Sequence, residues 1–342
     1  MRTLGALVTA LTLLALGGVA EARSALTYTR GSANPTVWLA NANGKQARRL
    51  GPGDQPLVAP NGSAVAATAI GSKGAALSVY RVGASTRRYF KLNKVAAVAL
   101  AWSPDSRYVA VELDGVSTSG KGSGLDVIDT RTDRVTTIAT GTVCGASFAP
   151  RRPDRLVYAQ APGSFACLNG HVNIFTVTPG GADRRQLTHD GLSLNPVWGP
   201  RSIAFDRATL RGKDEAPVYQ VWLMRSDGSH ARQVTHLSVS PLVVGLVPLA
   251  FSANGNRLLT RFEGQDTDET WTIQFPSGRA RELTIGGQSI QAGGLSRNGR
   301  TVLVGFGGFE GPPSHGTVAT LPFGGGHATV LVKHASEPSW NR

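Results

Sequence analysis

The chain has 342 residues, with 35 Lys and Arg against 22 Asp and Glu, a formal net charge of +13 and only two cysteines. An apolar fraction of 41% is ordinary for a globular chain, and no long polar or proline-rich linker divides the sequence, so we expect a single domain. The basic balance favours anionic partners such as cell-wall polymers, phospholipid head groups or acidic peptides.

The N-terminus predicts a secretory signal peptide over residues 1–22. Met1-Arg2 is a short basic start, Leu4 to Val19 is apolar, and Ala20-Glu21-Ala22 has the small-x-small form of a cleavage site. We therefore expect cleavage after Ala22 and a secreted or periplasmic protein of the cell envelope, residues 23–342, with no transmembrane segment. The alternative is a membrane anchor, although the run is short for a span of about 20 residues.

A strand–turn–strand pattern recurs through the rest of the chain and is clearest at Ala101-Trp-Ser-Pro-Asp-Ser-Arg-Tyr-Val-Ala-Val111. Its turns stand at Pro60, Pro104, Pro150, Pro200, Ala253 and Arg297, which by subtraction are 44 to 53 residues apart. A four-stranded propeller blade has a similar length of about 40–50 residues. The spacing therefore predicts a modular all-β array.

A second set of turns lies between the first. These markers are Asn43-Gly44, Gly83-Ala84, Arg131-Thr132, Gly180-Gly181, Asp227-Gly228, Ser277-Gly278 and Gly324-Gly325. Such pairs supply the positive φ angles of tight hairpins, so each unit has two hairpins and four strands. Basic residues follow at equivalent positions, namely Arg48-Arg49, Arg87-Arg88, Arg184-Arg185, Arg232 and Arg279. We expect them on outermost strands, where charge discourages edge pairing.

Two of these turns carry a family resemblance. Trp102-Ser-Pro-Asp105 is similar to the W-S-P-D-G turn of TolB-type, WD-repeat-like β-propellers, and Trp222-Leu-Met-Arg-Ser-Asp-Gly-Ser229 is similar to their M-x-x-D-G-S turn. The resemblance spans nearly everything after residue 24 and implies a β-propeller. Because many unrelated functions share this repeat, it implies no activity.

The count of turns predicts how the ring closes. Seven second-hairpin markers accompany only six first-hairpin turns between residues 58 and 303, so one unit lacks its first strand in chain order. Residues Glu337–Arg342 have the form of that strand, and Ala25–Thr29 has the form of its continuation. We expect a seven-bladed propeller of four-stranded antiparallel blades, closed by the C-terminal strand joining the N-terminal blade. Six blades is the alternative.

The two cysteines, Cys144 and Cys167, fall in one repeat unit. The first lies at the start of a first strand and the second in the loop between the second and third strands, so both would lie on one face. We expect a disulfide, which is favoured in an oxidising compartment and would close a loop of about 22 residues for roughly 3 kcal/mol. The alternative is two unrelated buried thiols. No ligand set for a metal accompanies them.

The connections between the two hairpins are long and all project from one face, which we call the loop face. They are Asp114–Gly124, Gln160–Gly170, Asp206–Pro217, Glu263–Glu269 and Gly305–Gly316. Loops on a rigid scaffold carry function, so the loop face is the predicted binding surface around the channel mouth. Its candidates are Lys121, Phe165, Arg207, Arg211, Lys213, Asp214, Glu215, Asp266, Asp268, Glu269 and Phe309.

Catalytic patterns are not found. No Gly-x-Ser-x-Gly elbow is present, and the seven histidines show neither His-x-His nor His-Glu-x-x-His spacing. We expect no cofactor, although Asp266-Thr-Asp268-Glu269 offers oxygen ligands for calcium. The sequence favours a monomeric, non-catalytic binding scaffold for a protein, a peptide or an anionic envelope polymer, and not for nucleic acid. The alternatives are a propeller enzyme of the lyase or sugar dehydrogenase type, with a site assembled from several blades, and a structural envelope protein.

Overall fold

The computed structural model describes residues 24–69, 76–84, 86–92, 96–114, 123–162, 167, 171–209, 218–238, 243–264, 268–307 and 316–341. Within them the regular structure is all β, with no α-helix. None of these residues forms a helix of the length and apolarity that crossing a membrane requires. The predicted signal peptide, residues 1–22, lies outside the described residues.

The strands form consecutive groups of four, as the two sets of turns predicted. Four-stranded sheets have the orders β28(Ser336–Trp340)-β1(Ala25–Arg30)-β2(Thr36–Asn41)-β3(Arg48–Pro52), β4(Asp54–Val58)-β5(Ala64–Thr68)-β6(Ala76–Arg81)-β7(Arg87–Lys91), and β8(Ala96–Trp102)-β9(Tyr108–Asp114)-β10(Gly124–Asp129)-β11(Arg134–Thr140). Two more are β12(Val143–Ala149)-β13(Arg152–Gln160)-β14(Asn173–Val177)-β15(Arg185–Gln186) and β24(Gln291–Leu295)-β25(Thr301–Phe306)-β26(Thr317–Pro322)-β27(Thr329–Lys333). The pairing within these sheets is antiparallel.

The remaining strands form one eight-stranded sheet. It contains β16(Ser193–Trp198), β17(Ile203–Thr209), β18(Val218–Met224) and β19(Arg232–Gln233), followed by β20(Val243–Phe251), β21(Arg257–Gly264), β22(Asp268–Gln274) and β23(Arg279–Leu283). The two groups are joined by a parallel pairing of Tyr219 with Gly245. A Cβ on Gly245 would lie 2.2 Å from the carbonyl oxygen of Tyr219, so this approach requires glycine.

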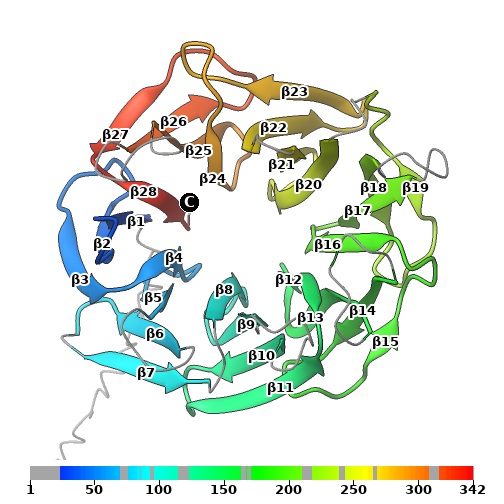
Figure 1. The fold of residues 1–342 in the computed structure, drawn as a ribbon, viewed down its shortest axis with the longest axis horizontal. Coiled ribbons are helices and arrows are strands. Elements are labelled where there is room, and N and C mark those ends of the chain that lie inside the picture. The colour runs from blue at the N-terminus through cyan, green and yellow to red at the C-terminus, as the bar shows by residue number, and fades with distance from the viewer. Residues whose placement is uncertain are drawn as a thin grey trace, which may run out of the picture.

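Figure 1 shows the groups arranged around a common axis. The first strand of each group, such as β4, β8 or β12, lies nearest the axis, and the last, such as β7 or β11, lies at the rim. Apolar side chains of neighbouring groups pack between them, for example Leu77 and Val79 with Val109 and Ile128. The predicted basic positions lie at the beginnings of the rim strands. Each of β3, β7, β15, β19 and β23 begins at one of these arginines or within one residue of it.

The first-hairpin turn is held by a serine side chain. Ser103 Oγ accepts hydrogen bonds from the backbone N–H groups of Arg107 and Tyr108, at 3.2 and 2.8 Å, and donates to Asp105 Oδ1 at 2.6 Å. Ser106 takes the left-handed conformation that glycine takes at Gly255 and Gly299 in other copies. Ser252 and Ser296 repeat this arrangement with Asn254 and Asn298 in place of the aspartate.

The glycine of several second-hairpin turns packs on the preceding group. A Cβ on Gly44 would lie 2.4 Å from the carbonyl oxygen of Leu331, and one on Gly228 would lie 2.8 Å from that of Leu187. The turn glycines therefore provide a close backbone approach between groups as well as a positive φ. The Gly44 contact links the N-terminal sheet to the sheet that contains β27.

The C-terminal strand pairs with the N-terminal strand. In the β28–β1 ladder, Trp340 is paired with Leu26 and Ser339 with Thr27. The adjacent Asn341 side chain accepts a hydrogen bond from Ala25 N at 2.8 Å and donates one to Pro60 O, in the next sheet, at 3.1 Å. The pairing is the one that the sequence predicted for these segments.

The outer strands β15 and β19 have only two residues each, and after each of them a threonine hydroxyl takes the place of a backbone carbonyl in the pairing. After β15, Thr188 Oγ1 accepts from Ile174 N at 2.9 Å, and after β19, Thr235 Oγ1 accepts from Val221 N at 2.9 Å. The hydroxyl satisfies the backbone donor that a fourth-strand carbonyl would otherwise meet.

Two predicted loops are shorter than the sequence indicated. Asp206 and Arg207 belong to β17, because the ladder with β18 continues to the pairing of Thr209 with Val218. Asp268 and Glu269 belong to β22, where Asp268 is paired with Glu263. The prediction that these residues lie in loops was wrong, since strand pairing continues through the polar residues at the ends of these strands.

Candidate binding groove

A groove of about 530 Å³ lies between the β4–β7 and β8–β11 sheets. It is lined by Asn61, Ser63, Ala64, Val79, Arg81, Val82, Gly83, Ala84, Arg88, Asp105, Ser106, Thr130 and Arg131. Most of these residues belong to first- and second-hairpin turns, so the groove opens on the face opposite the loop face. We call it the arginine groove.

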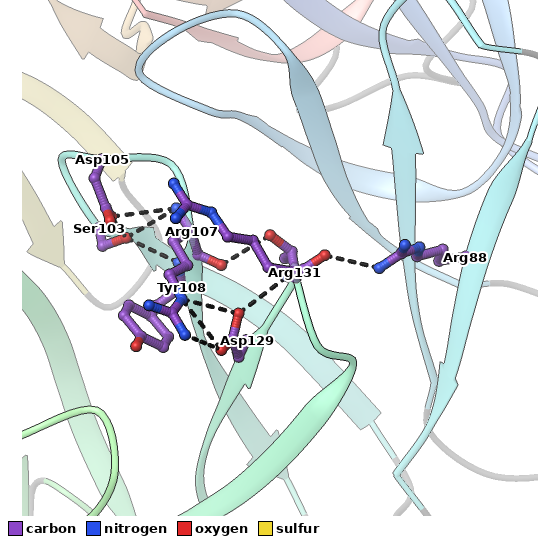
Figure 2. Close-up of polar contacts among 8 residues, drawn as sticks. Arg88, Ser103, Asp105, Arg107, Tyr108, Asp129 and Arg131 are labelled. Carbon is purple, nitrogen blue, oxygen red and sulfur yellow. Dashed lines mark hydrogen bonds and ion pairs between the residues drawn. The ribbon is translucent and has the colours of Figure 1, made fainter.

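Arg88 ties the two sheets together beneath this groove. Its Nη1 donates to the carbonyl oxygen of Thr130, next to Arg131, at 2.7 Å (Figure 2). Arg88 also forms an ion pair with Asp133. Arg281 repeats the arrangement elsewhere, because its Nη1 donates to Gly324 O at 2.8 Å between the sheet that contains β23 and the sheet that contains β26. The charge of Arg88 therefore has an internal partner.

Arg81 and Arg131 provide the uncompensated charge of the groove. Both side chains are exposed, and no carboxylate oxygen of the described residues lies within 4 Å of either guanidinium. Asp105 is the acidic member of the lining, and it is engaged with Ser103 and the backbone of Arg107. Two guanidinium groups are thus available to an anionic ligand, each with five N–H donors in a planar fork.

The wall next to Arg131 is anchored by a partly buried ion pair. Asp129 accepts from Arg107 Nη2 at 2.7 Å and from Nε at 3.1 Å, and its Oδ1 accepts from Arg131 N at 3.0 Å (Figure 2). The Arg107 guanidinium also lies 4.8 Å from the centre of the Tyr108 ring. Hydrogen bonding from Arg107 lowers the pKa of Asp129 to about 2. The pair fixes the backbone of the turn that carries Arg131.

The lining of the arginine groove favours charge and hydrogen bonding over stacking. It contains hydroxyl groups from Ser63, Ser106 and Thr130 and the Asn61 amide, but no aromatic ring. Recognition of single-stranded nucleic acid relies on stacking of bases on aromatic side chains. The groove is therefore suited to carboxylate or phosphate groups rather than to bases.

The structure places three of the predicted loop-face residues, and all three lie on strands. Arg207 is held internally, since its Nη2 lies 2.7 Å from Asp190 Oδ2 and its Nε donates to Ser193 Oγ at 3.1 Å. Glu269 accepts from Trp271 Nε1 at 2.8 Å. Asp268 begins β22. The others, Lys121, Phe165, Arg211, Lys213, Asp214, Glu215, Asp266 and Phe309, lie outside the described residues, as does most of the predicted calcium segment.

A buried carboxyl group lies beside Arg207 in the chain. Asp206 is 1% exposed, its Oδ2 accepts from Asn195 Nδ2 at 3.2 Å, and its Oδ1 has no hydrogen-bond partner. Burial raises the pKa of Asp206 to about 7 and, with Asp206 nearby, that of Tyr219 to about 12. Asp206 therefore lies in a low-dielectric site between sheets.

A second acidic pair joins the C-terminal strand to β4. Glu337 Oε2 accepts from Gln55 N at 2.8 Å, and the Asp54 side chain lies near the Glu337 carboxyl group. Burial, with the neighbouring Asp54, raises the pKa of Glu337 to about 8. At neutral pH the protonated Glu337 can donate to Asp54, which keeps the two carboxyl groups together.

Cys144 and Cys167 form a disulfide, with their Cα atoms 5.7 Å apart. Cys144 is buried in β12. The bond links the first strand of its sheet to the connection between the second and third strands. Among the described residues no group of three or more His, Cys, Asp or Glu side chains is placed to hold a metal ion.

Sequence reasoning missed the arginine groove because it assigned binding to the longest loops. Arg131 stood in a turn marker, and Arg81 ends the strand before another, but these turns looked purely structural. The available signal was the coincidence of basic residues at the second-hairpin turns of two consecutive repeats.

The strand arrangement is that of a β-propeller, and comparison with solved structures supports this class. TolB from Acinetobacter baumannii superposes with a TM-score of 0.53 at 14% identity, over 92% of this chain and 82% of that one. An oligogalacturonate lyase from Vibrio parahaemolyticus has a TM-score of 0.56 at 12% identity, over 84% and 89%.

A structure from a study of two prolyl endopeptidases has a TM-score of 0.62 at 13% identity, over 92% of this chain but 50% of that one. The chain therefore spans about half the length of that enzyme. No protein-family model matches the sequence, and no curated protein matches it. These similarities establish the fold and leave the function to the chain's own residues.

Proposed function

We propose that this chain is a secreted or periplasmic, non-catalytic binding scaffold that holds an anionic partner, namely a protein, a peptide or an envelope polymer. The observation that carries the proposal is the arginine groove, where Arg81 and Arg131 are exposed and lack acidic partners within the described residues. The formal net charge of +13 adds a long-range attraction for the same class of partner.

Two sources of rigidity support this role for the groove. Arg88 ties its two sheets together, and the Arg107–Asp129 pair holds the turn of Arg131. A rigid backbone lowers the conformational entropy that the turns of the groove lose when an anion binds. The groove therefore presents its two exposed guanidinium groups from a fixed backbone.

Fluorescence anisotropy with labelled poly-glutamate tests the proposal. The double variant Arg81→Gln/Arg131→Gln should bind at least about tenfold more weakly than the unaltered chain, which corresponds to about 1.4 kcal/mol. The matched control Arg232→Gln/Arg279→Gln removes the same charge from exposed rim positions outside the groove. Equal losses in both variants would assign binding to overall charge and reject the groove.

We also propose that the scaffold is a seven-bladed propeller, residues 23–342, closed by β28. The pairing of β28 with β1 and the contact of Gly44 with Leu331 support this closure. Deletion of residues 335–342 would then expose the edge of β1, and exposed edges template aggregation. Light scattering and thermal melting test this, and a monodisperse variant with the parent's melting temperature would contradict closure.

Export and the loop face complete the proposal. Secretion of a fusion that carries residues 1–22, compared with one that lacks them, tests the signal peptide. A pull-down from envelope extracts with the five long connections shortened tests whether the loop face also binds partners. Recovery of the same partners by both proteins would reject a role for those loops. Sedimentation tests the expected monomer.

A further inference from the structure

Three sheets carry a similar stack of two aromatic rings and a guanidinium, which comes from the second strand in two of them and from just before the fourth strand in the third. An aromatic residue of the second strand is paired across the ladder with an aromatic residue of the third, and a guanidinium lies over one or both rings. The pairs are Tyr28 with Trp38, Tyr158 with Phe175, and Phe205 with Trp222, and the cations are Arg30, Arg184 and Arg207.

In the sheet that contains β17, other residues of the chain accept the hydrogen bonds of the Arg207 guanidinium. Arg207 lies 4.3 Å from the centre of the Trp222 ring, and its remaining donors meet Asp190 Oδ2 at 2.7 Å and Ser193 Oγ at 3.1 Å. Burial lowers the pKa of Arg207, and the charge of Asp190 opposes this effect. A carboxylate and a hydroxyl therefore complete this stack.

In the sheet that contains β13, neutral acceptors complete the stack. Arg184 lies 3.9 Å from the centre of the Phe175 ring. Its Nε donates to the Tyr158 hydroxyl at 2.7 Å and its Nη2 to Gln160 Oε1 at 3.3 Å. Again the guanidinium has internal partners.

In the N-terminal sheet the same stack lacks its acceptors. Arg30 lies 4.8 Å from the centre of the Trp38 ring and 5.4 Å from that of Tyr28. Within the described residues no carboxylate lies within 4 Å of it, its Nε is buried without a hydrogen bond, and the buried Tyr28 hydroxyl also has none. Two buried polar groups of this stack therefore lack a hydrogen-bond partner among the described residues.

The missing acceptors can be traced to the first strand. Ser193 N donates to Val172 O, just before the third strand of the preceding sheet, and Ala335 N donates to Gly316 O, which likewise stands just before the third strand of the sheet that precedes β28. Ala335 therefore stands where Ser193 supplies the hydroxyl for Arg207. Alanine has no hydroxyl group, so it cannot accept a hydrogen bond from the Arg30 guanidinium.

We infer that the Arg30 stack binds a carboxylate group of an external ligand in the place that Asp190 takes beside Arg207. The ring of Trp38 holds the guanidinium in position, and the planar fork matches a carboxylate with two parallel hydrogen bonds. The connection from β1 to β2 is on the loop face, so this site is separate from the arginine groove and independent of the function proposed for it.

Arginine Nε–Hε resonances of the full chain, in a ¹H–¹⁵N correlation spectrum, test the inference. The probes are sodium acetate and an acetylated, amidated tripeptide with a central Glu, each compared with sodium chloride at equal ionic strength. The Arg30 resonance, assigned by its loss in Arg30→Lys, should shift saturably. The Arg207 resonance, assigned by its loss in Arg207→Lys, should not move, because its acceptors are internal.

The two probes separate the sources of the carboxylate. If the Glu tripeptide binds more tightly than acetate, the ligand is a peptide. If it binds equally or more weakly, the ligand is a small organic acid. Either result supports the site. The matching Gln tripeptide should leave Arg30 unchanged. A shift with chloride or inorganic phosphate alone, or equal shifts of Arg30 and Arg207, would overturn the inference.

The Arg30→Lys variant provides a second readout, the indole Nε1–Hε1 resonance of Trp38. Lysine keeps the charge but not the planar fork, so the affinity for the better carboxylate probe should fall at least about tenfold. Unchanged affinity would show that charge alone is responsible and would reject the stacked fork. An unchanged indole resonance of Trp271, which lies in another sheet, would show that the variant is folded before addition of ligand.

Discussion

Asp129 accepts hydrogen bonds from both Nε and Nη2 of Arg107, at 3.1 and 2.7 Å, at the end of the strand that leads into the arginine groove. The carboxylate is nearly buried, with 11% of its side chain exposed, whereas the Arg107 side chain is 33% exposed. The two side chains join the first-hairpin turn to the second-hairpin turn of one sheet, so their pairing influences stability and the shape of the groove together.

Acid should weaken the Arg107–Asp129 pair. The pKa of Asp129 is about 2 in the folded chain, below its ordinary 3.8, so its contribution is complete above about pH 4 and is lost as pH falls from about 4 to about 2. Asp129→Asn should cost about 1–2 kcal/mol at pH 7, less than the full shift because Arg107 is partly solvated. Urea unfolding across pH measures this.

Asp154→Asn is the control for that experiment. Asp154 forms an ion pair with Arg152 at 3.4 Å, and both side chains are about 60% exposed. Such surface pairs contribute little, so the change should stay within about 0.5 kcal/mol. An Asp129→Asn variant with the same acid dependence as the unaltered chain would contradict the assigned role.

Asp206 should act in the opposite direction with pH. Its pKa is about 7 in the folded chain, above the ordinary 3.8, so the folded state binds more protons and stability falls as pH rises from about 4 to about 7. Asp206→Asn removes this ionisation and keeps an oxygen for Asn195. We expect the variant to be more stable at pH 8 by about 2–4 kcal/mol.

Thermal or urea unfolding at pH 5 and pH 8 measures this difference. Asp183→Asn is the matched control, because Asp183 is 68% exposed beside Arg155 and should change little at either pH. If Asp206→Asn loses stability equally at both pH values, the carboxylate is ionised and paired in the native state instead.

Two turn glycines should respond differently to alanine. A Cβ on Gly44 would lie 2.4 Å from the Leu331 carbonyl oxygen, whereas one on Gly83 would meet no described atom within 4 Å. Both glycines have positive φ angles, 78° and 93°, so both substitutions carry a conformational cost of about 1 kcal/mol. Gly44→Ala should exceed Gly83→Ala by at least about 2 kcal/mol.

Chemical denaturation of the two alanine variants gives this comparison directly. Similar costs would mean that the backbone of β27 moves away easily, and that the approach of the N-terminal sheet to its neighbour is loose.

The disulfide should contribute measurable stability. Cys144 and Cys167 are 23 residues apart, and a loop of this length corresponds to about 3 kcal/mol in the chain-entropy model. Denaturation with and without reductant should therefore show a loss of about 2–3 kcal/mol. The Cys144→Ala/Cys167→Ala variant should be insensitive to reductant, and a loss in that variant would point to another effect of the reagent.

Much of the architecture was predictable from local signals. The turn at Trp102-Ser-Pro-Asp105 and the Asn-Gly or Asp-Gly pairs encode hairpins through side chains and φ angles close in sequence. The joining of Glu337–Arg342 to the N-terminal sheet followed from counting those hairpins. The ends of β17 and β22 did not follow, because ladder pairing overrides the polarity of Arg207 and Glu269.

The sequence by itself determined the repeat, its four-stranded unit, its turns and the cysteine pair, because each depends on residues near one another in the chain or within one repeat. Only the tertiary structure decided which arginines are available. Arg88, Arg184 and Arg207 find acceptors on other turns or strands, whereas Arg30, Arg81 and Arg131 find none among the described residues. Whether a charge is satisfied depends on the groups that folding brings beside it, and these lie up to a whole repeat away in the sequence.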